Sequence, residues 1–236
     1  MEQNLSKKTR TESDLIGSRE VPESALYGVQ TLRGIENFRI SKFHLNEYPL
    51  FIQALAITKM GAAVANRELD LLTEEQTDAI LRACKEILEG KHHEQFPVDM
   101  IQGGAGTTTN MNINEVVANR ALELMGHQRG EYQYCSPNDH VNRSQSTNDA
   151  YPTAIHIGLY YTHLKLVKHF EVLIEAFRKK GSEFAHIIKM GRTQLEDAVP
   201  MTLGQTFNGF ASILEHEVKN LDFAAQDFLT VNMGAT

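Results

Sequence analysis

Three short stretches of the sequence concentrate hydroxyl and amide side chains beside glycines or at the expected start of a helix. They are 103–112 (GGAGTTTNMN), 144–149 (SQSTND) and 191–197 (GRTQLED). Backbone N–H groups at a helix N-terminus, together with Ser, Thr and Asn donors, form an anion site without any fixed positive charge. A small dicarboxylate would suit three such stretches. The alternative is that each stretch only caps the helix after it, because Ser, Thr and Asn are common N-cap residues.

Other ligand classes fit these stretches poorly. The glycine-rich stretch lacks the lysine of a nucleotide-binding P-loop and does not connect a strand to a helix. The ten histidines show no H-E-x-x-H or comparable ligand spacing, so we predict no metal site. There is no G-x-S-x-G elbow and no Cys–His pair that spacing alone would support. We therefore expect an enzyme or binding protein that works without a cofactor.

Composition narrows the setting in which the protein acts. The formal net charge is -7, with Lys and Arg interspersed among Asp and Glu, which gives no footprint for nucleic acid or an anionic membrane. No apolar run approaches the roughly 20 residues that span a bilayer. The polar start has no signal-peptide core, and Cys84 and Cys135 lie far apart, as free thiols do. We expect a cytoplasmic protein.

Helices must position the three polar stretches. Apolar residues at helical spacing predict a helix over 48–72, and Thr73 with Gln76 forms a capping box that opens a second helix ending near Gly90. A further helix is expected at about 112–125. Two apolar stripes, at about 151–180 and 202–231, are each about 30 residues long, well above the mean helix length of about 11–12.

These elements predict an all-α fold. Residues 1–13 are interpreted as a mobile tail and 14–145 as a mostly helical N-terminal domain. Residues 146–236 are expected to form the first long helices of a central antiparallel bundle. Two such helices leave apolar surface that needs further helices or partner subunits, so we expect the chain to stop partway through its architecture.

Four segments carry a family resemblance that extends from about Leu15 to the last residue. They read GSREVPESALYGVQTLRGIENF, GGAGTTTNMNINEVVANRALELMG, HVNRSQSTNDAYPTA and KMGRTQLEDAVPMTLGQ. In this order and spacing they resemble the N-terminal segment and the three signature regions of the aspartase/fumarase superfamily. The resemblance implies a lyase with a helical fold.

Within that family the sequence favours the aspartase branch over class II fumarases. Fumarases typically have Ser where Ala105 stands, a second Ser at Thr147 and His at Gln194. Their accessory-site pattern H-P-N-D-D is replaced here by SPNDH at 136–140. The implied reaction is the reversible deamination of L-aspartate to fumarate and ammonia, through Cβ proton abstraction and an aci-carboxylate. Class II fumarate hydratase is the alternative, and a non-catalytic helical assembly module is another.

The resemblance assigns roles to six residues of the polar stretches. Thr107, Ser146 and Thr147 would hold the β-carboxylate, on which negative charge gathers. Asn148 and Gln194 would orient the amino group, and Thr193 would lie near the α-carboxylate. Gln194 replaces a His of some relatives and can only hydrogen-bond.

Four further residues would support the first loop. Gly104 and Gly106 would allow close backbone approach to the ligand, and Thr108 and Asn110 complete the loop. In the family, the general base is a serine in a mobile S-S-x-M-P loop, which these 236 residues lack. The family forms homotetramers whose sites combine regions of different subunits, so we expect this segment alone to be inactive.

Overall fold

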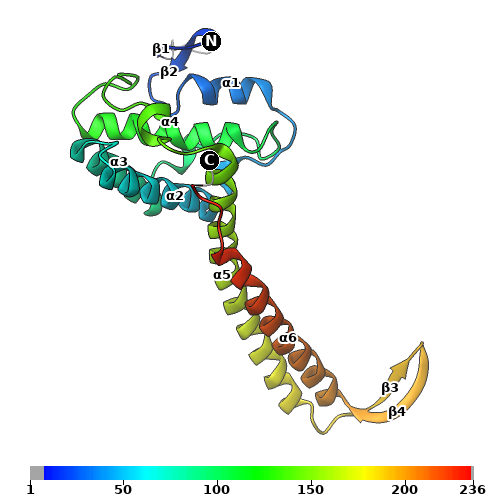
Figure 1. The fold of residues 1–236 in the computed structure, drawn as a ribbon. Coiled ribbons are helices and arrows are strands. Elements are labelled where there is room, and N and C mark those ends of the chain that lie inside the picture. Colours follow the sequence, from blue (N-terminus) through cyan, green and yellow to red (C-terminus); the bar gives the residue numbers. More distant parts are fainter. Residues whose placement is uncertain (1–7, 235–236) are drawn as a thin grey trace, which may run out of the picture. The chain divides into compact units, whose positions relative to one another are not determined.

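The computed structural model describes residues 8–234, and its contacts divide them into two units (Figure 1). One unit runs as far as Gly158 and takes in the segment from Val231 onward. The other is Leu159–Thr230. Each unit is described by itself.

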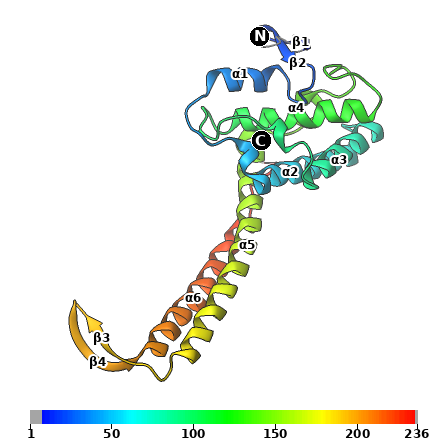
Figure 2. The same ribbon diagram turned by 180° about the vertical axis from the view of Figure 1, so that it is seen from behind.

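In the first unit, helix α4 (Thr107–Leu124) lies between α1 (Val29–Asn37) on one side and α2 (Pro49–Glu68) with α3 (Glu74–Leu88) on the other (Figures 1 and 2). Nearly every residue of α4 from Thr109 to Leu122 is buried. A helix that is covered all round belongs at the centre of its unit. α2 begins and ends within a few residues of the helix that the sequence predicts over 48–72.

Residues 9–13, interpreted from the sequence as part of a mobile tail, instead form strand β1 (Thr9–Asp14). It pairs antiparallel with β2 (Gly17–Pro22). The hydroxyls of Thr9 and Thr11 both donate to Glu20 at 2.6 Å. A hairpin held by polar cross-strand contacts shows little apolar alternation, so the sequence pattern did not reveal it. Residues 1–7 of the expected tail lie outside the described residues.

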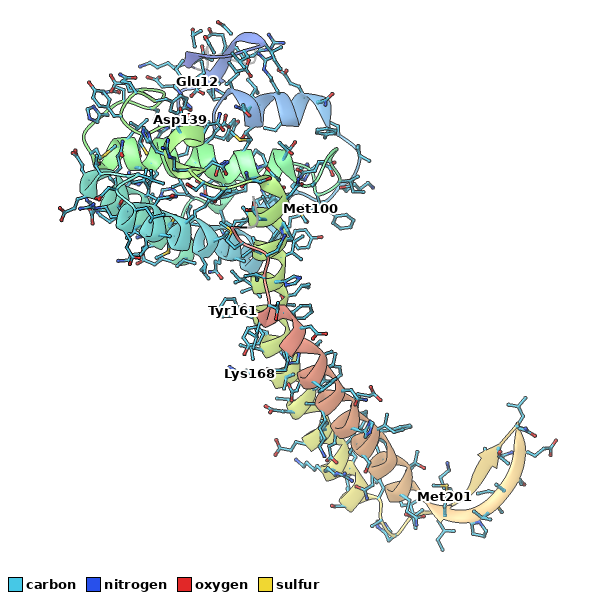
Figure 3. The ribbon with its side chains drawn as sticks, in the orientation of Figure 1. Glu12, Met100, Asp139, Tyr161, Lys168 and Met201 are labelled. Carbon is cyan, nitrogen blue, oxygen red and sulfur yellow. The ribbon has the colours of Figure 1, made fainter. Side chains whose placement is uncertain are left out.

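Two buried carboxylates tie the N-terminus of α1 to the rest of the unit. Glu12, on β1 and labelled in Figure 3, accepts the N–H of Val29 at 3.0 Å. Glu115, on α4, accepts the N–H groups of Gly28 and Thr31 at 2.8 and 3.0 Å. Negative charge is favoured at a helix N-terminus, where backbone N–H groups have no partner within the helix.

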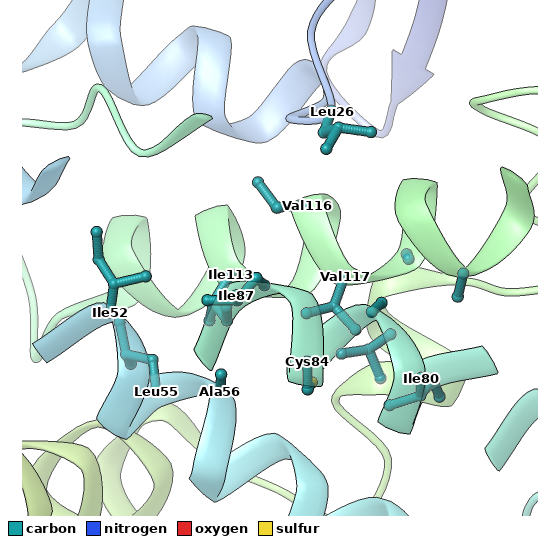
Figure 4. Packing of buried hydrophobic residues seen from close by; sticks show 14 of the residues in the cluster. Leu26, Ile52, Leu55, Ala56, Ile80, Cys84, Ile87, Ile113, Val116 and Val117 are labelled. Carbon is teal, nitrogen blue, oxygen red and sulfur yellow. The ribbon is translucent and has the colours of Figure 1, made fainter. Parts of the chain in front are cut away.

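The core of this unit fills the space between α2, α3 and α4 (Figure 4). Its wholly buried side chains include Ile52, Leu55, Ile80, Cys84, Ile87, Ile113, Val116 and Val117. The capping box is confirmed, because Thr73 Oγ1 accepts the Gln76 N–H at 3.1 Å and Gln76 Oε1 accepts the Thr73 N–H at 3.2 Å. Both cysteines are buried free thiols, as predicted.

Short turns complete the first unit. They are the 3-10 turns η1 (Leu45–Glu47) and η2 (His93–Gln95) and the π-helical turn η3 (Pro137–Val141). Gly90, the predicted helix stop, has a left-handed φ of 87° just beyond α3. The predicted helix near 112–125 begins earlier, at Thr107, directly after the glycine-rich stretch.

The two long predicted helices are α5 (Thr147–Glu183) and α6 (Leu203–Ala225), followed by the 3-10 turn η4 (Gln226–Leu229). Within the second unit α5 and α6 lie side by side and antiparallel (Figures 1 and 2). Phe177 of α5 packs against Phe207 and Phe210 of α6, with ring centroids 6.1 and 5.6 Å apart. The all-α prediction is confirmed for the described residues, apart from small β-hairpins that it did not include.

The first three turns of α5 belong to the first unit, so the bundle does not begin at 146 as predicted from the sequence. Ala154 is fully buried in the core, and a Cβ placed on Gly158 would lie 3.6 Å from the Ala54 Cβ, in ordinary van der Waals contact. The Tyr151 and Phe51 rings meet edge to face at 5.7 Å. Packing against α2 therefore moves the division of the chain into the middle of a continuous helix.

Candidate functional site

The first two polar stretches come together in the first unit, where they begin α4 and α5. Thr107 and Thr147 are the first residues of these helices. Asn110 Nδ2 donates to Thr147 Oγ1 at 3.1 Å and so links the two helix starts. Gly106 has a φ of 82°, and a Cβ on it would overlap the Tyr151 ring. Glycine is therefore required there both by the backbone and by the space.

A cavity of about 330 Å³ opens where the two stretches meet. Its lining includes Gly104, Ala105 and Gly106 from the first stretch and Asn148 and Tyr151 from α5. Met100, labelled in Figure 3, completes one side. The cavity is large enough for a ligand of the size of a four-carbon dicarboxylate, and Asn148 in the first turn of α5 gives it a polar side chain.

Among the expected donors of the first two stretches, Asn148 lines this cavity, whereas Thr107, Ser146 and Thr147 lie at the starts of the two helices outside its lining. The four also differ in exposure. Thr107 and Asn148 are exposed, whereas Ser146 and Thr147 are half-buried. Ser146 also caps α5, because its Oγ accepts the Asn148 N–H at 3.2 Å and its carbonyl accepts the Ala150 N–H at 3.0 Å. Capping and ligand binding are compatible, since a hydroxyl that accepts one hydrogen bond still has its own hydrogen to donate.

A buried cation that was not predicted from the sequence lies behind the site. Lys59 of α2 is wholly buried, and its Nζ donates to Asn110 Oδ1, Asn142 Oδ1 and Gln145 Oε1 at 2.7, 3.0 and 2.9 Å. Burial lowers the pKa of Lys59 to about 7, and the nearby Asp149 carboxylate opposes this shift. The sequence signal that could have revealed it is the position of Lys59 on the otherwise apolar face of the predicted helix over 48–72.

The third polar stretch lies in the second unit, at the tip of a hairpin between β3 (Ile188–Thr193) and β4 (Glu196–Thr202). Thr193 and Gln194 are exposed there. Gln194 and Leu195 both have positive φ, 47° and 67°, which is the turn that normally requires Asn-Gly. Strained residues at a loop tip point to a functional constraint. The structure thus groups only the residues of the first two stretches.

The side chains of segment 136–140, which stands in place of the fumarase accessory pattern, form hydrogen bonds within the segment. The Ser136 N–H donates to His140 Nδ1 at 2.7 Å, and Ser136 Oγ pairs with Asp139 at 2.9 Å. These contacts stabilise the turn η3. Burial lowers the pKa of His140, so this ring serves as an acceptor within the turn.

Residues 8–234 show neither a metal-ligand cluster nor a membrane-spanning helix. No group of three or more His, Cys, Asp and Glu side chains in this range is arranged to hold a metal ion. Over the same residues, no helix combines the length and the apolar character that crossing a bilayer requires.

Comparison with known proteins decides the family. The profile of a family described as lyase matches residues 17–236. The chain belongs to this lyase family. The resemblance to the aspartase/fumarase superfamily, inferred from four motifs, is thereby confirmed, as is its helical fold.

Relatives in the lyase family are similar over nearly the whole chain. An aspartate ammonia-lyase of Pseudomonas canavaninivorans is 57% identical over 96% of this chain and 48% of its own length. One of Escherichia coli K12 is 55% identical over 98% of this chain and 49% of its own length. The chain thus spans about half the length of the curated relatives it matches.

Solved structures of the lyase family share the fold. A native fumarate lyase:delta crystallin from Brucella melitensis has a TM-score of 0.94 and 50% identity, covering 97% of this chain and 53% of the other. A class II fumarase from Schistosoma mansoni has a TM-score of 0.88 and 35% identity, covering 97% and 48%.

Proposed function

We propose that the full-length protein is an aspartate ammonia-lyase, which converts L-aspartate reversibly to fumarate and ammonia. The observation that carries the proposal is 55–57% identity to aspartate ammonia-lyases over nearly the whole chain, against 35% to a class II fumarase. Ala105, Thr147 and Gln194, the three positions that favour the aspartase branch in the sequence, support the same choice.

The reaction requires donors at one substrate carboxylate. Removal of the poorly acidic Cβ proton produces a carbanion, which is stabilised as an aci-carboxylate with extra charge on the β-carboxylate oxygens. Preorganised donors aimed at those oxygens stabilise the transition state more than the substrate. We assign this role to the hydroxyls of Thr107, Ser146 and Thr147, which begin α4 and α5.

The neighbouring residues complete the proposed binding site. Asn148 lines the cavity and would contact the amino group. Gly104 and Gly106 would admit the substrate close to the backbone, and Asn110 holds Thr147. Thr108 has a supporting role only, because its side chain fills the space beside Gly34 of α1.

Thr193 and Gln194 would act in a site shared between subunits of a homotetramer. Their exposure at a strained hairpin tip supports this proposal. Apolar side chains of the second unit also remain uncovered: Val172, Ile213 and Phe223 are 67%, 61% and 83% exposed. Association with other helices would bury this surface. Thr193 would then lie near the α-carboxylate, and Gln194 near the amino group.

The proton-abstracting base is proposed to come from the remainder of the protein. Since the chain spans about half of its curated relatives, the base need not be among the residues described here. We expect a serine on a mobile loop of the S-S-x-M-P kind. The expected cytoplasmic location stays a prediction, and we propose neither metal nor cofactor for the reaction.

A class II fumarate hydratase is the second candidate, since a class II fumarase shares the fold with a TM-score of 0.88. The two are separated by supplying the purified full-length protein with L-aspartate and, separately, with L-malate. Fumarate is followed by its ultraviolet absorbance and ammonia by a coupled assay. Fumarate and ammonia from aspartate alone support the ammonia-lyase, and fumarate from malate alone means the hydratase. Turnover of neither would favour a non-catalytic assembly module.

A further inference from the structure

Lys59 lies in the middle of α2, with no exposed surface, among the core residues of the first unit. An ammonium group buried without partners would be strongly unfavourable. Here each of its three hydrogens has an acceptor, one oxygen each from Asn110, Asn142 and Gln145. The cation is therefore held by neutral amides, which come from α4 and from the loop that precedes α5.

This arrangement fixes the direction of every amide around the cation. A lysine ammonium only donates, so each amide must turn its oxygen inward and its NH2 group outward. Asn142 Nδ2 then donates to the Gln145 carbonyl at 3.1 Å, and Gln145 Nε2 to the Val141 carbonyl at 2.9 Å. Asn110 Nδ2 donates to Thr147 Oγ1 at 3.1 Å. This chain of bonds ends on the Thr147 hydroxyl.

The direction of the last bond decides what Thr147 can do. A hydroxyl has one hydrogen and two lone pairs. Because Thr147 Oγ1 accepts from Asn110, its single hydrogen stays available for a ligand at the start of α5, next to Asn148, which lines the cavity. Hydrogen bonds in such a chain also polarise one another, and a positive charge at the far end makes the terminal hydroxyl a stronger donor.

We propose that Lys59, in its protonated form, is a positioning residue for the dicarboxylate site: through Asn110 it sets Thr147 as a hydrogen-bond donor, and it adds a positive charge behind the polar loops. The proposal rests on the dicarboxylate site of the proposed function. It gives the buried cation a role in ligand binding rather than in packing alone.

The charges around Lys59 are compatible with that role. Cys84 faces it from α3, and burial raises the pKa of this thiol to about 12, so it is neutral. Asp149, in the first turn of α5, is close enough to favour the charged lysine. The groups that contact the ammonium directly are neutral amides, which leave its charge free to act on an incoming anion.

The test measures binding of succinate, an unreactive dicarboxylate, to the full-length protein by calorimetry. Lys59→Met removes the charge at similar length, and we expect succinate affinity to fall by at least about tenfold, the range for hydrogen bonds that involve charge. Thr58→Val is the matched control. Thr58 is buried on the same helix, and among the described residues its hydroxyl bonds only to the Ala54 carbonyl of its own helix, so affinity should be unchanged.

Asn110→Asp keeps the test decisive if Lys59→Met does not fold. Aspartate has the shape of asparagine and still accepts from Lys59, but it cannot donate to Thr147. The Thr147 hydroxyl then donates its hydrogen to the new carboxylate and no longer has one for the ligand. We expect a native circular dichroism spectrum and a loss of succinate affinity of at least about tenfold.

A double-mutant cycle separates positioning from general damage. If Lys59 acts through Thr147, the combined Lys59→Met and Thr147→Val change weakens succinate binding by clearly less than the product of the two single effects. Multiplicative effects, or Asn110→Asp binding succinate as the wild type does, would overturn the proposal. Ammonia release from aspartate is assayed in parallel. A wild type that binds succinate but releases no ammonia refutes the proposed reaction and leaves this inference standing.

Discussion

At the scale of single residues, the direction of a hydrogen bond matters as much as its presence. Ser146, Thr147 and Asn110 all have structural partners, yet Ser146 and Thr147 keep a hydrogen for a ligand. The site therefore needs no choice between capping a helix and binding an anion. What these hydroxyls share is their place at the start of α5, next to Asn148, which lines the cavity.

Thr147→Val tests this view directly. Removing one preorganised donor to a developing oxyanion typically lowers kcat about 10²–10³-fold, and we expect a loss of that order in ammonia release by the full-length protein. The thermal midpoint should change little, since Thr147 is only half-buried. Retention of more than a tenth of wild-type kcat would contradict the assignment.

Thr153→Val supplies both a control and a prediction of its own. Thr153 lies on the same helix and is buried, and its hydroxyl has no hydrogen-bond partner among the described residues. Replacing it with a similarly shaped apolar side chain should stabilise the protein by about 1 kcal/mol. Differential scanning calorimetry should show a midpoint about 2–4 °C higher, with ammonia release unchanged. A lower midpoint would show that the hydroxyl has a partner in the assembled protein.

At the scale of elements, α4 is held against α3 by a charged contact at the rim of their apolar interface. Arg120 of α4 binds Glu86 of α3 through Nε at 2.6 Å and Nη2 at 2.8 Å. Both side chains are about three-quarters buried. The hydrogen bond from Arg120 lowers the pKa of Glu86 to about 2, and His92 adds to the shift.

This contact predicts a specific dependence of stability on pH. Because the pKa of Glu86 is lower in the folded protein than its ordinary 4.5, its stabilisation is fully present above pH 4.5 and is lost as pH falls toward 2. Glu86→Gln should destabilise the protein by about 1–3 kcal/mol at pH 7. The gap to the wild type should shrink in acid, as measured by thermal unfolding midpoints between pH 7 and 3.

Asp78→Asn is the matched control for that series. Asp78 is on the same helix and pairs with Arg82 at 3.4 Å, but both side chains are more than half exposed. Such a surface pair contributes little to stability, so the variant should follow the wild type at every pH. A gap between Glu86→Gln and wild type that is constant with pH would contradict the role of the carboxylate charge.

At the scale of the whole molecule, the proposed site draws on two units of the chain. Thr147 belongs to the first unit, and Gln194 lies at the hairpin tip of the second. If sites are shared between subunits, each subunit contributes these residues to different sites. Neither residue would then need a complete site within its own chain.

Subunit mixing tests this arrangement. Full-length Thr147→Val and Gln194→Ala subunits, each nearly inactive alone, are co-expressed and purified as mixed oligomers. With random assortment, about a quarter of the sites would receive both wild-type residues, because closed symmetric assemblies repeat the same contact. Ammonia release near that fraction of wild type supports shared sites. Mixed oligomers as inactive as the parents would show that both residues come from one chain.

Local signals in the sequence determined the elements and the chemistry of the loops. Helical periodicity identified α2, α5 and α6, and the Thr73–Gln76 capping box identified the start of α3, because these depend on residues within one or two turns. The polar stretches around Thr107 and Thr147 were recognisable for the same reason. The resemblance then identified the family without any knowledge of packing.

Only the tertiary structure decided which residues meet. The bond from Asn110 to Thr147 spans 37 residues, and those from Lys59 span 51 to 86. Sequence periodicity assigns such a lysine to a helix face but cannot say that three distant amide oxygens surround it. The hairpin at 9–22 was also not predicted from sequence periodicity, since its stability comes from polar cross-strand pairs rather than apolar alternation. Burial of a charge depends on what the rest of the chain places around it, and that is a property of the folded molecule.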